Sequence, residues 1–165
     1  MYISEFMSKY YISIDQGTTS SRAVLYDSSF KQITQEQQEF TQHYPAEGSV
    51  EHDPEEIWNS VFKTVISLMS KNGINSSEVI SIGITNQRET VMLWDKEGKV
   101  LNKAIVWQDR RTTDFCEELK GRGVEPEVTE TTGLLLDPYF SATKARWLLK
   151  KHKIDPTKYF FGTID

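Results

Sequence analysis

Residues 10–27 have the sequence YYISIDQGTTSSRAVLYD, in which two runs of β-branched and aromatic residues flank a short polar segment. This pattern predicts a hairpin with strands at 10–15 and 22–27. A Gly-Thr-Thr-Ser turn can direct backbone N–H groups and hydroxyls at an anion, and Asp15 at the strand end can hold a hydrated magnesium ion. The hairpin therefore indicates a phosphate site, although ordinary turns share its composition and the lysine of a P-loop is absent.

The residues after the hairpin predict a third strand and then a long helix. The third strand is expected at the surface of the sheet within 31–42. Asp53 can cap a helix that begins at Pro54 and ends near Lys71. Three- and four-residue spacing predicts the buried face of this helix, formed by Trp58, Val61, Phe62, Val65, Ile66 and Met69.

Strand and helix patterns alternate through the rest of the chain. Expected strands lie at 79–84 (buried), 91–95, 104–107 and from 159 onward, and expected helices lie at 113–120 and after Asp137-Pro138. This order predicts an α/β fold with a mixed sheet and flanking helices.

A second polar segment, Asn-Gln-Arg-Glu at 86–89, follows the strand at 79–84. A turn there could bring the side chains of Arg88 and Glu89 together. Forked donors beside a carboxylate acceptor could hold neighbouring hydroxyls of a neutral polyol without leaving net charge in the pocket. The alternative is an exposed surface ion pair, which is common in proteins.

Two aromatic residues stand beside charged residues in the later segments. Trp107 precedes the charged residues at 109–111, a combination that suits a pocket with one apolar wall, but a core tryptophan gives the same pattern. Tyr139, expected in a first helical turn, could offer its hydroxyl to a substrate or pack on the core. Both alternatives stay open for both residues.

Composition and charge exclude several classes of function. The 165 residues include 19 Lys and Arg against 24 Asp and Glu, a net charge of −5, which argues against nucleic acid as a partner. No apolar run approaches the roughly 18 to 20 residues that cross a bilayer, and residues 1–10 lack a secretion signal, so we expect a cytoplasmic protein without membrane insertion.

The histidines and the cysteine give no sign of a metal site or a nucleophile. His43, His52 and His152 are scattered, and we expect solvated or capping roles for them. Cys116 is the sole cysteine, which excludes an internal disulfide, and it is expected in the core.

Several blocks of the sequence together resemble the FGGY carbohydrate kinases, in particular those that act on glycerol. The blocks are DQGTTSSR at 15–22, GITNQRET at 83–90, WQDRRT at 107–112, TG at 132–133 with DPYFSATK at 137–144, and FGTID at 161–165. The resemblance implies an actin-like, ribonuclease-H-like ATPase fold. Residues 10–165, after a tail at 1–9, would be the N-terminal part of the first domain, incomplete at its C-terminus and without the second domain.

The resemblance also implies an activity and a set of site residues. Two domains close on MgATP and transfer the γ-phosphoryl group to the terminal hydroxyl of glycerol, so ATP and Mg²⁺ are the expected cofactors. Thr18, Thr19, Ser20 and Arg22 match contacts to the nucleotide phosphates, and Asp15 matches a carboxylate near magnesium, through water. The groups that match glycerol contacts are Arg88, Glu89 and Tyr139, with Trp107 as the apolar wall.

The catalytic base expected from the resemblance is an aspartate farther along the chain than Asp165. A homo-oligomer of the complete protein is also compatible with the resemblance. Two other readings stay open: a noncatalytic actin-like module that binds nucleotide or a partner, and an FGGY kinase for another polyol or a sugar. The segment at 86–90 favours the polyol kinase, because a chaperone-like ATPase has no need of it.

Overall fold

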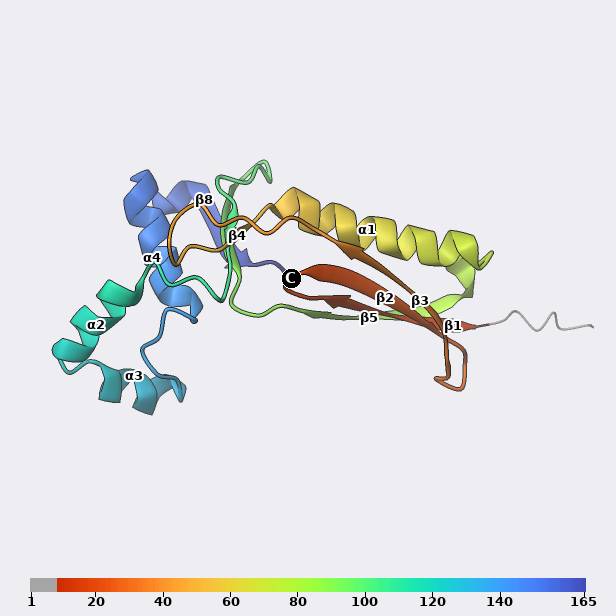
Figure 1. Cartoon of the computed structure of the whole chain (residues 1–165), viewed down its shortest axis with the longest axis horizontal. Helices are drawn as coiled ribbons and strands as arrows, with labels where there is room; N and C mark the ends of the chain where they lie inside the picture. The colour runs from red at the N-terminus through yellow and green to blue at the C-terminus, as the bar shows by residue number, and fades with distance from the viewer. Residues whose placement is uncertain (1–8) are drawn as a thin grey trace, which may run out of the picture. The chain divides into compact units, whose positions relative to one another are not determined.

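The computed structural model describes residues 9–165 and divides them into two compact units (Figure 1). The first unit runs through Thr41 and includes Glu55–Asn86, and the second comprises Gln42–Pro54 and Gln87–Asp165. Of the N-terminal tail expected at 1–9, all but Lys9 lies outside the described residues. The assignment of 10–165 to part of one domain stays a prediction.

The first unit contains a mixed four-stranded sheet. Its strands are β1 (Tyr10–Gln16), β2 (Ser20–Tyr26), β3 (Gln32–Glu39) and β5 (Val79–Asn86), in the order β3-β2-β1-β5. β1 is antiparallel to β2 and parallel to β5, and β2 is antiparallel to β3. The expected hairpin and third strand are therefore confirmed.

The expectation that the strand at 79–84 is buried is wrong. Ile80, Ile82 and Ile84 are 47%, 48% and 70% exposed. β5 is the last strand of the sheet on its side, so it has a neighbouring strand on one edge only. Apolar composition predicted the strand itself correctly but not its surroundings.

Helix α1 (Pro54–Lys71) packs on the sheet of the first unit, and half of the expected face is confirmed, since Val61, Val65 and Met69 pack against the core (Figure 1). Its buried residues are Ile57, Ser60, Thr64 and Leu68, whereas Trp58, Phe62 and Ile66 are at least half exposed. The buried face includes two hydroxyl residues whose oxygens hydrogen-bond inside the interface, Ser60 to Ile57 O and Thr64 to Ser60 O. A stripe chosen from apolar residues alone misses such positions.

The second unit has an antiparallel four-stranded sheet with helices. Its strands are β4 (Glu51–His52), β6 (Val91–Asp95), β7 (Ala104–Ile105) and β8 (Tyr159–Thr163), in the order β4-β7-β6-β8. The helices are α2 (Thr113–Gly121), α3 (Glu125–Thr132) and α4 (Ser141–His152), and short 3₁₀ turns lie at Ser76–Glu78, in the first unit, and Pro156–Lys158. Leu148 of α4 packs in a core with Val91, Leu93 and Ile105.

Three details of the second unit differ from expectation. α4 begins at Ser141, because Asp137 and Pro138 belong to a preceding turn in which Asp137 O accepts from Phe140 N–H. β7 ends at Ile105, so Trp107 lies beyond the strand. α3 was not expected: its sequence EPEVTETT buries no residue and so has no apolar stripe to detect.

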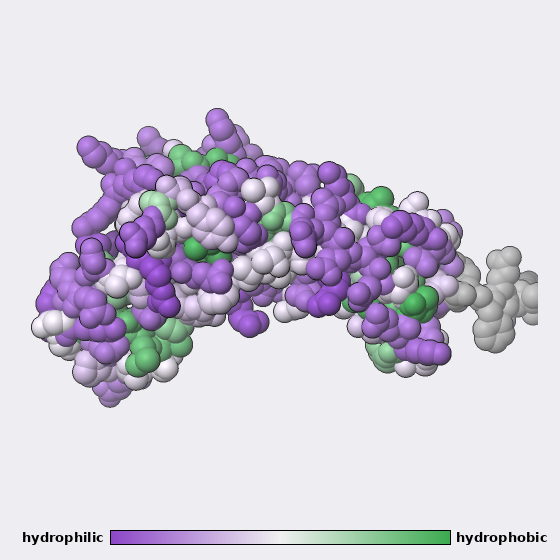
Figure 2. All heavy atoms as spheres, in the orientation of Figure 1, coloured by the Kyte–Doolittle hydropathy of each residue, from purple (hydrophilic) through white to green (hydrophobic). Residues whose placement is uncertain are grey.

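The surface agrees with the acidic, polar composition. Figure 2 shows hydrophilic side chains over most of the visible face, with hydrophobic ones in small patches. Among residues 9–165, no helix combines the length and the apolar character that crossing a membrane requires.

Candidate functional site

The turn of the β1–β2 hairpin is held tightly by its own backbone. Gly17 N–H donates to Ser20 O at 2.9 Å, and a Cβ atom at Gly17 would lie only 3.2 Å from that oxygen. Thr19 is exposed, and Thr18 and Ser20 are half-buried. The turn therefore presents three hydroxyl residues in a fixed loop, which is the arrangement expected of a phosphate-binding turn.

The hairpin turn is also anchored to its neighbours. Ser21 is fully buried, and its Oγ lies 2.7 Å from Ser60 Oγ of α1. Gln37 of β3 donates to Ser20 Oγ at 2.9 Å. The Ser20 hydroxyl is thus used as an acceptor in this contact, which leaves its own proton to be donated to an anion.

Asp15 and Arg22 form an ion pair across the hairpin. They are directly opposite each other in the β1–β2 register, Arg22 Nη2 lies 2.9 Å from Asp15 Oδ2, and both side chains are 44% exposed. A guanidinium has five N–H donors and a carboxylate about four acceptor positions, so both groups keep capacity for a ligand. This contact between a residue expected near magnesium and one expected at the phosphates is not evident from the sequence pattern.

Asp15 is suited to a water-mediated magnesium site. Its carboxylate is a hard oxygen donor with access to solvent, the type that Mg²⁺ prefers. Over the described residues, no cluster of three or more His, Cys, Asp or Glu side chains could enclose a metal ion. A magnesium ion at Asp15 would therefore keep several waters and need oxygens from a bound phosphate, which is its usual habit at nucleotide sites.

The turn between β5 and β6 places Glu89 in an uncommon backbone conformation. Its φ is 63°, in the left-handed region, which costs a non-glycine residue on the order of 1 kcal/mol and is concentrated at functional sites. Buried polar contacts support the turn: Thr90 Oγ1 donates to Gln87 Oε1 at 2.9 Å, and Gln87 Nε2 lies 3.2 Å from His52 Nδ1.

The expectation of a solvated or capping role is wrong for His52. Its side chain is fully buried, and its Nε2 lies 2.6 Å from Gln42 Oε1. A buried imidazole needs partners for both ring nitrogens, and Gln42 and Gln87 provide them. His52 thus stiffens the base of the turn that carries Arg88 and Glu89.

The Glu89 carboxylate is held at the start of α4. Its Oε2 accepts from Ser141 N–H at 2.8 Å and from Ser141 Oγ at 2.5 Å. The position is favourable because the N-terminus of a helix carries unpaired N–H groups and partial positive charge. Within the described part of the chain, Glu89 Oε1 receives no hydrogen bond, so one carboxylate oxygen is fixed and the other is available as an acceptor.

The expected contact between Arg88 and Glu89 is not formed. Arg88 is exposed, and the ion pairs among residues 9–165 do not include one between these two side chains. Glu89 contacts α4 instead. Arg88 remains next to Glu89 in the chain, and its guanidinium is free of any ion pair within the described residues.

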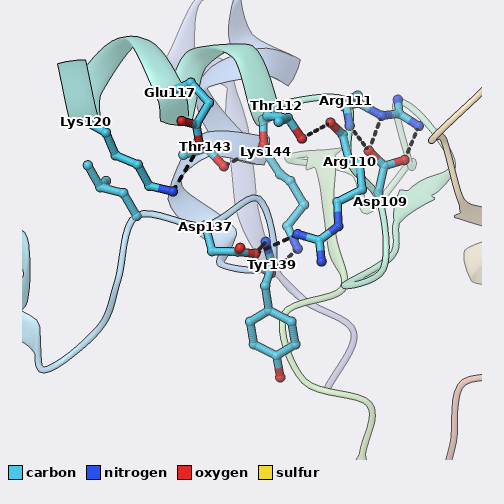
Figure 3. A network of polar contacts seen from close by, with 12 residues as sticks. Asp109, Arg110, Arg111, Thr112, Glu117, Lys120, Asp137, Tyr139, Thr143 and Lys144 are labelled. Carbon is cyan, nitrogen blue, oxygen red and sulfur yellow. Dashed lines mark hydrogen bonds and ion pairs between the residues drawn. The ribbon is translucent and has the colours of Figure 1, made fainter. Parts of the chain in front are cut away.

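The structure does bring Trp107 and Tyr139 together. Their ring centroids lie 5.8 Å apart at an interplanar angle of 66°, an edge-to-face contact, and both are half-buried. Asp137 Oδ1 accepts from Tyr139 N–H at 2.8 Å and from Arg110 at 2.9 Å. Figure 3 shows the Tyr139 hydroxyl pointing away from this polar network. The hydroxyl is therefore not one of the hydrogen-bonding groups of the network.

A buried ion network supports the segment after Trp107. Arg111 Nη2 lies 2.8 Å from both Asp109 Oδ2 and Glu51 Oε1, and Val50 N–H donates to Asp109 Oδ2 at 2.6 Å. Burial lowers the pKa of Arg111, but hydrogen bonds to Asp109 and Glu51 outweigh it, so the pKa is raised and the guanidinium stays charged. The guanidinium also stacks on Trp147, 4.6 Å from the ring centroid.

Sequence reasoning missed the residues that hold this site in place. Ser141, Lys144 and the pair Asp109–Arg111 received no individual role, although all four stand in the quoted blocks. Charged residues in a polar segment or a helix are ordinarily solvated, and nothing in the local pattern shows that these are buried. Cys116 is buried as expected, and burial raises the pKa of its thiol.

Comparison with known proteins shows the family. Residues 10–159 match the N-terminal domain of the FGGY family of carbohydrate kinases, and the chain belongs to this family. The resemblance carried by the sequence blocks is confirmed, and so is the α/β fold class with its mixed sheet and helices.

Its curated relatives include glycerol kinases. The chain is 53% identical to the glycerol kinase of Brucella ovis over 165 residues, which cover 96% of the chain and 33% of the relative. It is 52% identical over 163 residues to that of Shewanella woodyi, with 95% and 33% covered. The chain thus spans about a third of the length of the curated relatives it matches.

Solved structures of the family share the fold. Plasmodium falciparum glycerol kinase with ADP superimposes with a TM-score of 0.84 at 34% identity, over 95% of the chain and 33% of that structure. Gluconate kinase from Lactobacillus acidophilus gives a TM-score of 0.87 at 24% identity, over 95% and 32%. The second likeness shows the fold alone.

Proposed function

We propose that this chain supplies the polyol-binding residues and the phosphate-binding hairpin of an ATP-dependent glycerol kinase. Family membership supports ATP-dependent phosphorylation of a carbohydrate, and the relatives named glycerol kinase at 52–53% identity support glycerol as the acceptor. A cytoplasmic location and a homo-oligomer of the complete protein stay predictions.

The arrangement of Glu89 is the observation that carries the proposal. One carboxylate oxygen is fixed by Ser141, the other is available, and the same unit presents an edge-to-face pair of half-buried aromatic rings, Trp107 and Tyr139. A small polyol has hydroxyls that donate to a carboxylate and C–H groups that pack on an aromatic face. Arg88 adds guanidinium donors for the hydroxyl oxygens, and Tyr139 adds a phenolic hydroxyl.

The hairpin residues are proposed to hold the phosphates of ATP. Thr18, Thr19 and Ser20 offer hydroxyls on a fixed turn, and Arg22 adds a half-exposed guanidinium. Bound Mg²⁺, held through water near Asp15, would offset negative charge on the transferring phosphoryl group. Phosphoryl transfer mainly requires that the reacting groups are positioned and that the negative charge of the phosphates is compensated. These residues can contribute to both.

Neither carboxylate of the two regions is suited to remove the proton from the attacking hydroxyl. Asp15 is engaged by Arg22, and Glu89 accepts two hydrogen bonds from Ser141. Each carboxylate is thus already engaged as an acceptor within the chain, which suits a binding role. The proposal therefore keeps the base on an aspartate beyond Asp165.

A substrate panel with the complete protein tests the proposal. ADP release from ATP would be followed with glycerol, a longer polyol, xylulose and gluconate, with a no-acceptor control. We expect the highest kcat/KM with glycerol. A higher value for another acceptor would assign the protein to a different FGGY kinase, and nucleotide turnover indifferent to every acceptor would favour a noncatalytic or chaperone-like module.

A further inference from the structure

Lys144 of α4 is a fully buried lysine whose amino group joins two proposed substrate-binding segments. Its side chain is 0% exposed. The amino group donates to Glu89 O and, at 2.6 Å, to Tyr139 O. In Figure 3 the Lys144 side chain extends from its helix into the polar network beside Asp137 and Tyr139.

Such a placement is unfavourable unless the ammonium is compensated. A buried cation requires hydrogen-bond acceptors and nearby negative charge. Lys144 has the two carbonyls, and the carboxylates of Glu89, Asp109 and Asp137 lie close enough to favour its charged form. Burial still dominates and lowers the pKa of Lys144 to about 8. An apolar side chain would fill the same space without the free-energy cost of burying an amino group. The amino group of Lys144 therefore has a role that an apolar residue could not perform.

The two carbonyls that accept from Lys144 belong to residues that lie far from each other in the sequence. Glu89 lies 55 residues from Lys144, on the β5–β6 turn, and Tyr139 lies 5 residues away, on the turn before α4. A single nitrogen bonded to both carbonyls sets the distance between the two backbones, because each N–H···O bond has a narrow range of length.

Lys144 also cooperates with Ser141. The two residues are three apart in α4 and therefore lie on the same side of the helix. Ser141 holds the carboxylate of Glu89 and Lys144 holds its backbone carbonyl, so the first turn of α4 secures this left-handed residue at two points. Loss of either contact would let the acceptor oxygen move relative to the Trp107–Tyr139 pair.

We propose that Lys144 is a positioning residue that sets the spacing of Glu89 and Tyr139 for the acceptor substrate. The inference rests on the proposed function, since it takes Glu89 and Tyr139 as the polyol-binding residues. Lys144 does not touch the substrate in this account. It acts through the two backbones, so its loss should affect the acceptor and not the nucleotide.

The test compares Lys144→Met with Lys150→Met in the complete protein. Methionine has a similar length and no N–H donor, and Lys150 is an exposed lysine of the same helix. We expect Lys144→Met to raise the KM for glycerol at least tenfold while the KM for ATP stays within twofold, and Lys150→Met to change neither. An unchanged KM for glycerol, or equal increases in both KM values, in a folded Lys144→Met protein would overturn the proposal.

Three further measurements keep the outcome decisive. If Lys144→Met does not fold, Lys144→Arg is measured in its place; it keeps the charge but displaces the donors, and an unchanged glycerol KM would again refute the role. If the wild type prefers another acceptor, the proposed function fails and the same KM comparison is made with that acceptor. If the wild type accepts none of the acceptors, backbone amide hydrogen exchange is measured at residues 87–90 and 137–141. Faster exchange in Lys144→Met than in Lys150→Met would support the positioning role of Lys144. Equal exchange in the two variants would refute it.

Discussion

The hairpin region and the Glu89 region are held in different ways. In the hairpin, the polar residues lie within eight consecutive positions, 15–22, and their main ion pair is half exposed. Around Glu89, residues from the β5–β6 turn, the segment after β7 and the start of α4 are joined by partly buried contacts, two of them made by a fully buried lysine. One local turn can provide a phosphate-binding site. A binding site for a small neutral acceptor instead requires groups from several segments of the chain, held at fixed distances from one another.

Glu89→Gln should have the largest effect if the acceptor site is built as described. The amide removes the negative charge and replaces one acceptor oxygen with a donor, so both the Ser141 contacts and the polyol contact weaken. Loss of hydrogen bonds to a charged group costs roughly 1.5–3 kcal/mol, which corresponds to about a ten- to hundredfold fall in kcat/KM for glycerol. Steady-state kinetics of the complete protein measure it, with Glu97→Gln, at an exposed turn, as the control.

Arg88→Ala distinguishes the acceptor region from the nucleotide region. We expect the KM for glycerol to rise about tenfold, the order of one charged hydrogen bond, and the KM for ATP to change far less. The measurement is the pair of KM values under saturating co-substrate. Equal changes in the two values would remove Arg88 from the acceptor site.

Arg22→Ala should give the opposite result. Its guanidinium is assigned to the phosphates, so the KM for ATP should rise several-fold with a smaller change for glycerol. The partly exposed ion pair with Asp15 contributes about 1 kcal/mol or less to stability, so the variant should fold. An increase confined to the glycerol KM would reverse the assignment of the two regions.

The buried lysine predicts a pH dependence of the free energy of unfolding. Folded Lys144 loses its proton near pH 8, whereas an unfolded lysine keeps it to about pH 10.4. Between these values the unfolded state binds more protons, so this group makes the free energy of unfolding rise with pH. From pH 8.5 to 9.5, wild type should gain about 1 kcal/mol relative to Lys144→Met, measured by denaturant unfolding. Parallel pH profiles for the two proteins would show that the Lys144 pKa is not lowered by folding.

The same contrast explains how far sequence reasoning could reach. The hairpin, the helix after Asp53 and the final strand follow from local patterns, and the structure confirms them. The face of α1 was only half correct: Val61, Val65 and Met69 pack on the core, but Ser60 and Thr64 are buried with hydroxyls that hydrogen-bond to backbone oxygens, which apolar periodicity does not register.

The candidate site shows more clearly what could not be predicted from the sequence. The sequence identified Glu89, Trp107 and Tyr139 as residue types that suit a polyol, and the structure places Trp107 against Tyr139. It could not reveal that Glu89 turns to Ser141 rather than Arg88, because the left-handed backbone at Glu89 depends on contacts with α4, 52 residues away. The role of Lys144 could not be predicted from the sequence either, since a lysine in a helix is normally exposed.

The central claim is that Glu89 and the Trp107–Tyr139 pair form the acceptor site, and a crystal structure of the complete protein with glycerol tests it most directly. The account predicts a glycerol hydroxyl within hydrogen-bond distance of Glu89 Oε1, with the carbon backbone against Trp107 and Glu89 Oε2 still bonded to Ser141. Glycerol bound elsewhere, with Trp107 and Tyr139 untouched, would contradict it.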